Sequence, residues 1–95
     1  MRASVVSGYR PGMARDLGSI DRTVRPHGRQ IAAVLAERIG TPVLPWRSLL
    51  PSYVDLAAYY GVSVAAVRYA VRELAREGLV VVRQGHRTRV ADEQP

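Results

Sequence analysis

The chain has 95 residues, enough for one small domain. With 47% hydrophobic and 23% charged residues it has the composition of a globular protein, and without cysteine it excludes disulfide frameworks, thiolate zinc sites and cysteine nucleophiles. Fourteen arginines, with no lysine, stand against eight acidic residues, so the net charge is +6 and the pI is near 10.8. This balance favours polyanionic partners, nucleic acid first.

The N-terminal stretch is expected to be a flexible, basic arm. It contains several glycines and scattered arginines but no sustained apolar period. Two interpretations are open: an arm that follows a nucleic-acid backbone, or a solvated terminus without a function. The expected organisation is an arm at 1–25, a domain at 26–91 and a short tail at 92–95. Apolar runs are too short for a spanning helix or a signal peptide.

The first helix is predicted to start near Pro26. Apolar residues then recur at i, i+3, i+4 and i+8, which is one helical face: Ile31, Val34, Leu35 and Ile39. Gly40-Thr41-Pro42 ends the helix, since glycine suits its C′ position and proline cannot continue it. Residues 42–51 form a connector with three prolines, in which Trp46 is expected to be a core anchor rather than a base-stacking platform.

A short second helix and a longer third helix follow the connector. Ser52 and Asp55 have the spacing of a capping box, and Gly61 ends the second helix. Ser63 is expected to cap the third helix. A buried stripe is predicted along that helix, at Val64, Val67, Val71 and Leu74, while arginines step by four along another face, at Arg68, Arg72 and Arg76.

Two short strands are predicted at the C-terminal end. The β-branched run 79–82 and the segment 87–91 flank a turn at Gln84-Gly85-His86, which makes a hairpin. The predicted order is helix, short helix, turn, long helix, hairpin. The fold class is therefore mainly α with a β-hairpin, a winged helix-turn-helix of three helices and a two-stranded wing, whose long helix enters the major groove of DNA.

The stretch from Arg29 to Ala91 resembles the GntR-type winged helix-turn-helix domain of bacterial transcription regulators. The matching segments, in the family's order, are Leu50-Pro51-Ser52, Asp55-Leu56-Ala57, Gly61-Val62-Ser63, Val67-Arg68, Ala70-Val71, Leu74, Glu77-Gly78-Leu79, Arg83-Gln84-Gly85 and Thr88-Arg89-Val90. The resemblance implies a cytoplasmic, nucleoid-associated regulator that binds double-stranded DNA as a homodimer on a pseudo-palindromic operator.

The resemblance also implies DNA contacts from the start of the second helix, the start of the third helix and the wing tip. Arg68 is the best single candidate for a specific contact, against the alternative of a solvated helix arginine. Each candidate tyrosine either hydrogen-bonds a phosphate or packs in the core, and the wing tip either reaches DNA or is simply exposed. The candidate DNA-binding residues are Ser52, Tyr53, Ser63, Val64, Ala65, Arg68, Tyr69, Gln84, Gly85, His86 and Arg87.

The sequence departs from the family at several positions. After Leu-Pro-Ser the family usually has Glu-Arg, where this chain has Tyr53-Val54. After Val-Ser the family often has Arg with Thr, where this chain has Val64-Ala65-Ala66, and the wing's usual Gly-x-Gly is Gly85-His86-Arg87. Two contact arginines are therefore missing. The family's C-terminal metabolite-binding domain is missing too, so no small-molecule effector is expected, and a dimer would use the first helix, the connector or the arm.

The favoured function is sequence-specific binding of double-stranded DNA by a bacterial transcription regulator, most simply a repressor. Two alternatives remain: a winged-helix module for protein–protein interaction, and an architectural accessory DNA-binding factor of a mobile element. An enzyme is not expected, because no catalytic set or phosphate-cradling loop can be assembled. No cofactor or metal is expected either, since His27 and His86 lie far apart in sequence.

Overall fold

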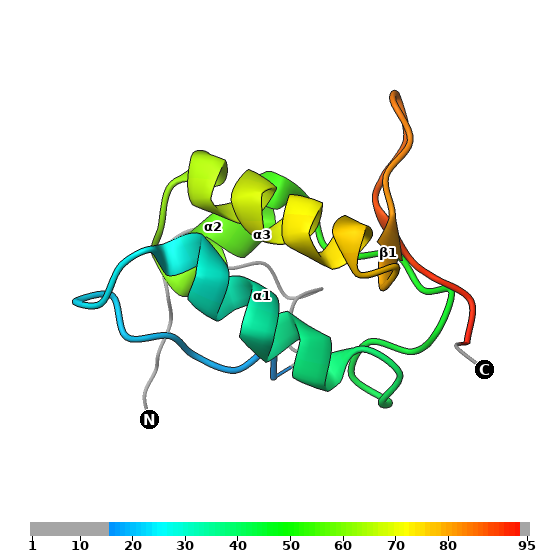
Figure 1. The fold of residues 1–95 in the computed structure, drawn as a ribbon, viewed down its shortest axis with the longest axis horizontal. Coiled ribbons are helices and arrows are strands. Elements are labelled where there is room, and N and C mark those ends of the chain that lie inside the picture. Colours follow the sequence, from blue (N-terminus) through cyan, green and yellow to red (C-terminus); the bar gives the residue numbers. More distant parts are fainter. Residues whose placement is uncertain (1–15, 94–95) are drawn as a thin grey trace.

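The computed structural model describes residues 16–93 and contains the predicted winged helix. Figure 1 shows helices α1 and α3 lying side by side and the hairpin projecting beyond the end of α3. The sheet is antiparallel, with Val80 opposite Val90. The elements are α1 (His27–Arg38), α2 (Tyr53–Tyr60), α3 (Val64–Arg76), β1 (Val80–Val81) and β2 (Arg89–Val90). Three helices plus a two-stranded wing confirm the predicted fold class.

The centre of the core is the apolar stripe of α3. Val67, Ala70, Val71 and Leu74 are buried there, whereas Val64, which was predicted to share the stripe, is only half-buried. The stripe packs between α1 and α2 and also meets β1. Burying apolar side chains stabilises the fold by about 25 cal/mol per Å² removed from water. The two flanking helices are thus held together through α3.

Serine caps and a glycine define the turn between α2 and α3. The Ser52 hydroxyl accepts a hydrogen bond from the Asp55 N–H (3.1 Å), and the Ser63 hydroxyl accepts one from the Ala66 N–H (3.1 Å). Gly61 ends α2 with a φ of 72°, a left-handed conformation that favours glycine. Both predicted caps are confirmed, and together they fix where α3 begins.

The connector contributes a third chain to the sheet, which the sequence did not predict. The Leu50 N–H donates to the Thr88 carbonyl (2.9 Å), and the Val90 N–H donates to the Ser48 carbonyl (2.7 Å). Residues 48–50 therefore run along β2 on the side that β1 leaves open. The wing is held to the domain through this pairing as well as through its own hairpin.

The end of α1 and the following turn agree with the prediction. Helix α1 ends at Arg38, and Gly40 has a φ of +87°. A Cβ at Gly40 would lie 2.8 Å from the Trp46 ring, which is half-buried and packs against the core. Trp46 is accordingly a core anchor.

Residues 16–25 are docked on the domain, so the expected arm is wrong for this part of 1–25. The Leu17 side chain is fully buried. Its N–H donates to the Tyr59 hydroxyl (3.1 Å) and its carbonyl accepts from the Tyr60 hydroxyl (2.8 Å). A single anchoring leucine creates no apolar period, which is why the sequence pattern missed it. Residues 1–15 lie outside the described residues.

Helices α1 and α3 approach closely at Gly28. A Cβ added there would lie 2.6 Å from Cδ1 of Tyr69 and 2.8 Å from the carbonyl oxygen of Ala66. The second of these atoms belongs to the backbone of α3, which cannot turn away as a side chain can. The missing side chain at Gly28 is therefore what lets the two helices pack at this distance.

We expect Gly28→Ala to lower the free energy of unfolding by about 1–3 kcal/mol, because overpacking would push α1 away from α3. Glycine-to-alanine changes in a helix otherwise raise stability by up to about 1 kcal/mol. Urea unfolding measures the effect, and Ala33→Gly at an exposed position of the same helix reports the propensity difference alone. A more stable Gly28→Ala variant would contradict the close approach.

Tyr60 generates a second prediction, about alkaline pH. Burial is the main cause that raises the pKa of the Tyr60 hydroxyl above its usual value of 10.0. A group whose pKa is higher in the folded state stabilises the fold below its unfolded pKa, and this contribution is lost as the pH rises further. The unfolding free energy of the wild type should therefore fall above pH 10.

Tyr60→Phe isolates this effect in paired denaturation curves. At pH 7 the variant should be about 1–3 kcal/mol less stable, because the buried Leu17 carbonyl loses its donor. Above pH 10 the gap should narrow by about 1.4 kcal/mol per pH unit. A gap that stays constant up to pH 11 would mean that Tyr60 ionises as easily in the folded state.

Candidate nucleic-acid interface

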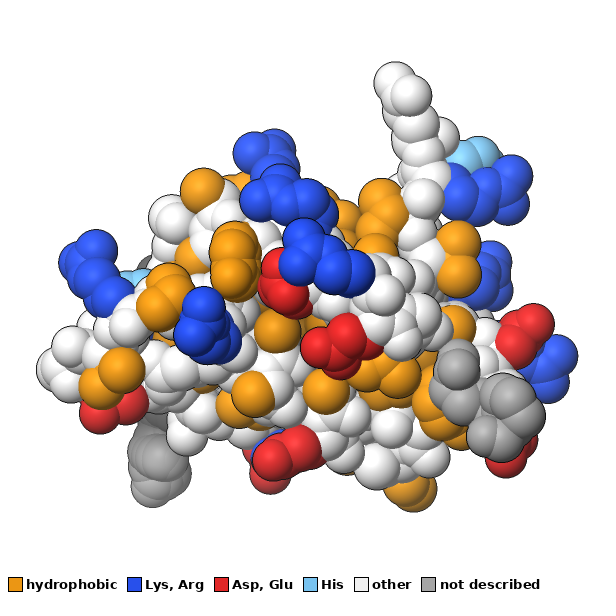
Figure 2. Space-filling view, viewed as in Figure 1, with side chains coloured by type: hydrophobic (Ala, Val, Ile, Leu, Met, Phe, Trp, Pro, Cys, Tyr) orange, Lys and Arg blue, Asp and Glu red, His pale blue; other side chains and the backbone are white. Residues whose placement is uncertain are grey.

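The outward face of α3 is basic. Because its buried stripe faces the other helices, Ala65, Arg68, Arg72 and Arg76 are exposed on the opposite side. Figure 2 shows arginine side chains gathered along this helix. Arg76 pairs with Glu73 at 3.2 Å, whereas Arg68 and Arg72 have no ion-pair partner among residues 16–93. Two guanidinium groups are thus available to an anionic ligand.

A hollow of about 250 Å³ lies between α3 and the wing. Its floor is apolar, and the two unpaired arginines stand at its rim. The lining residues are Tyr53, Arg68, Val71, Arg72, Ala75 and Val82. A concave surface between a projecting helix and a hairpin, edged by positive charge, suits an extended polyanion that passes over the helix.

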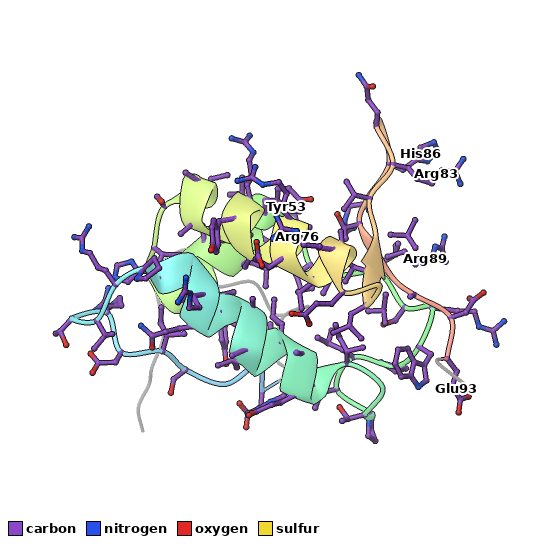
Figure 3. All side chains as sticks on the ribbon, in the orientation of Figure 1. Tyr53, Arg76, Arg83, His86, Arg89 and Glu93 are labelled. Carbon is purple, nitrogen blue, oxygen red and sulfur yellow. The ribbon has the colours of Figure 1, made fainter. Side chains whose placement is uncertain are left out.

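The wing ends in a tight turn that exposes polar and basic groups. The His86 N–H donates to the Arg83 carbonyl (3.0 Å), and Gly85 supplies the φ of +82° that this turn needs. In Figure 3, Arg83 and His86 extend from the hairpin on the side away from α3. Arg87 differs, because its guanidinium turns back and donates to the Leu50 carbonyl at the base of the wing.

The predicted site residues fall into two groups. Ser52 and Ser63 cap their helices, so their hydroxyls are engaged with backbone N–H groups. The Tyr53 hydroxyl shares a hydrogen bond with the Thr88 hydroxyl (2.9 Å), and Tyr69 is half-buried against Gly28. The exposed predicted residues are Ala65, Arg68, Gln84, Gly85, His86 and Arg87, while Val64 is half-buried.

The structure brings the start of α2 and the wing together in a second hollow of about 220 Å³. It is lined by Pro51, Ser52, Tyr53, His86, Arg87 and Thr88. Two residues that the sequence analysis did not include also belong to the exposed basic surface, Arg72 and Arg83. The four-residue step from Arg68 was a sufficient signal for Arg72, whereas nothing in the local pattern distinguished Arg83.

Other classes of site were searched in the same region. Among residues 16–93, no three His, Asp or Glu side chains are grouped as a metal site would require. The helices of this region are also too short and too polar to cross a membrane.

Comparison with known proteins gives a consistent family. Residues 27–90 match the bacterial regulatory proteins of the gntR family. An uncharacterised HTH-type transcriptional regulator of Mycobacterium bovis and the HTH-type transcriptional regulator Mce2R of Mycobacterium tuberculosis are each 44% identical over 68 residues. The match covers 67% of this chain and 28% of each relative, so the chain spans under a third of their length.

Two solved structures resemble the fold. AraR(DBD) in complex with operator ORX1 has a TM-score of 0.65 and 25% identity, over 76% of this chain and 87% of that one. A transcriptional antiterminator from Listeria monocytogenes has a TM-score of 0.69 and 25% identity, over 79% and 57%. The match across residues 27–90, together with three helices and a wing in the expected order, means that the chain belongs to the gntR family of bacterial regulatory proteins.

Proposed function

We propose that this chain binds double-stranded DNA in a sequence-specific manner and regulates transcription, as a repressor that blocks promoter access. The observation that carries the proposal is the outward face of α3, where Arg68 and Arg72 are exposed without an ion-pair partner among residues 16–93. The solved complex of AraR(DBD) with its operator supports it, because that domain shares the fold.

In the proposed complex, α3 lies in the major groove, which is about 12 Å wide and admits one helix. Arg68 binds a guanine through a bidentate pair of hydrogen bonds, and the small Ala65 lets the helix approach closely enough to touch a thymine methyl. The wing extends alongside, so that Arg83 and His86 contact phosphates or the edge of the minor groove. Sequence is read by α3, and the wing fixes the orientation.

The chain acts in this proposal as a homodimer in the cytoplasm, on DNA of the nucleoid. One helix and one wing cover only a few base pairs, so a single copy discriminates poorly between sites. Two copies on an inverted repeat double the contacts, and their half-sites would lie one helical turn apart or a multiple of it.

Selection from random duplexes tests the proposal. We expect the wild-type chain to enrich an inverted repeat at a stated salt concentration, and Arg68→Ala to bind the selected duplex about 5- to 150-fold more weakly, which corresponds to about 1–3 kcal/mol for one bidentate contact. Arg68→Ala should also relax the consensus at one position of each half-site.

Arg76→Ala is the matched control on the same helix. Arg76 is held by Glu73 at 3.2 Å, so its loss should leave the consensus unchanged and weaken binding only a few-fold. Recovery of a pool without any consensus would replace the regulator with an architectural DNA-binding factor. Failure to recover DNA at any salt concentration would overturn DNA binding and favour a protein partner.

A further inference from the structure

The loop at residues 21–26, just before α1, presents two arginines. Arg22 and Arg25 are exposed, and neither forms an ion pair within residues 16–93. The acidic side chain in this loop, Asp21, accepts hydrogen bonds from the N–H (2.9 Å) and the hydroxyl (2.6 Å) of Thr23. The carboxylate is thereby turned into the loop, and the guanidinium groups are left facing solvent.

The loop is fixed by hydrogen bonds although it buries little. The Gln30 amide donates to the carbonyls of Asp21 and Val24 (2.8 Å each), and its oxygen accepts from the Asp21 N–H (2.9 Å). The His27 ring donates to the Arg22 carbonyl (2.8 Å). Val24 is 51% exposed, so apolar burial does not account for this order. What the network achieves is to hold two cations at fixed positions on the surface.

The position of the loop relates it to the proposed DNA-binding surface. Arg22 donates to the carbonyl of Gly61 (3.2 Å), in the turn that leads into α3. Gly28, at the start of α1, lies against Ala66 in the first turn of α3. The loop is therefore beside the N-terminal end of α3, whereas the wing follows its C-terminal end, as Figure 1 shows.

We propose that the 21–26 loop is a second contact with the DNA backbone, in which Arg22 and Arg25 bind phosphates on the flank of the site opposite the wing. This inference rests on the proposed DNA binding and adds a named surface to it. The loop lies outside residues 27–90, the stretch that matches the gntR family, so it is a feature of this chain beyond the matched domain.

Phosphate rather than base contact follows from the geometry and the side chains. The loop flanks α3 and does not lie on its outward face, where the base edges would be reached. Arginine pairs well with phosphate oxygens, and Arg22 uses one donor group on Gly61, which leaves others free. A loop whose backbone is already ordered loses little conformational entropy when it binds.

The test is the salt dependence of binding to the selected duplex and to a random-sequence duplex, both with extra flanking base pairs. Each lost phosphate contact should reduce the slope of log K against log salt by about one. We expect a reduction of about one per bound copy for Arg25→Gln and about two for Arg22→Gln/Arg25→Gln, with the consensus unchanged. Arg25→Gln alone keeps the test decisive, because Arg22 also supports the turn at Gly61.

Two further variants separate charge from position. Arg47→Asn removes one exposed arginine far from the loop, at a residue with a φ of 70° that asparagine tolerates, and should leave the slope unchanged. Gln30→Ala keeps every charge but releases the loop, and should weaken binding several-fold to both duplexes. Thermal unfolding of each variant verifies that it is folded.

An unchanged slope and affinity for Arg25→Gln and for the double variant, with the wild type still binding, would overturn the loop contact and leave the proposed function intact. An altered consensus would also overturn it, since the arginines would then contact bases. No DNA binding by the wild type would overturn both proposals and make the loop a surface for another acidic partner.

Discussion

Burial of the apolar stripe of α3 is the constraint on which the rest of the structure depends. Val67, Ala70, Val71 and Leu74 are enclosed by α1 and α2, so the rotation of α3 about its axis is fixed. With 3.6 residues per turn, the residues spaced by four on the other side must then face outward. The exposure of Arg68 and Arg72 is thus a consequence of core packing. A change that rotates α3 would alter the core and the proposed DNA-binding face together.

Tyrosines and one glycine set the positions of the other elements around α3. Tyr53 joins the start of α2 to the wing through Thr88, and Tyr60 ties the end of α2 to the chain before α1. Tyr69 occupies the space that a side chain at Gly28 would take. Each tyrosine combines a large apolar ring with a hydroxyl, which suits it to the boundary between core and surface. Chemical groups that resemble candidate phosphate ligands in the sequence are largely used to join elements.

The parts of the fold that the sequence predicted are those with local signals. The caps at Ser52 and Ser63, the stripe of α3 and the turn at Gly85 depend on residues within a few positions of one another. The docking of Leu17 and the pairing of 48–50 with β2 depend on contacts some forty residues apart along the chain, which leave no period to detect. For the candidate site, exposure of Arg68 was predictable from spacing, whereas the turn of Arg87 towards Leu50 was not.

The distribution of charge indicates how such a domain divides affinity from specificity. At the start of α2, where the family usually has a DNA-contacting arginine, this chain has Val54, which is 68% exposed and uncharged. Positive charge stands instead at both ends of α3, in the 21–26 loop and on the wing. Contacts with phosphates raise affinity for every sequence and make it depend on salt, whereas base contacts from α3 discriminate. With few side chains on α3 able to reach bases, one copy would hold DNA well and discriminate weakly. Specificity would then come from requiring two copies at a fixed spacing, because a geometric requirement adds discrimination without adding a base contact.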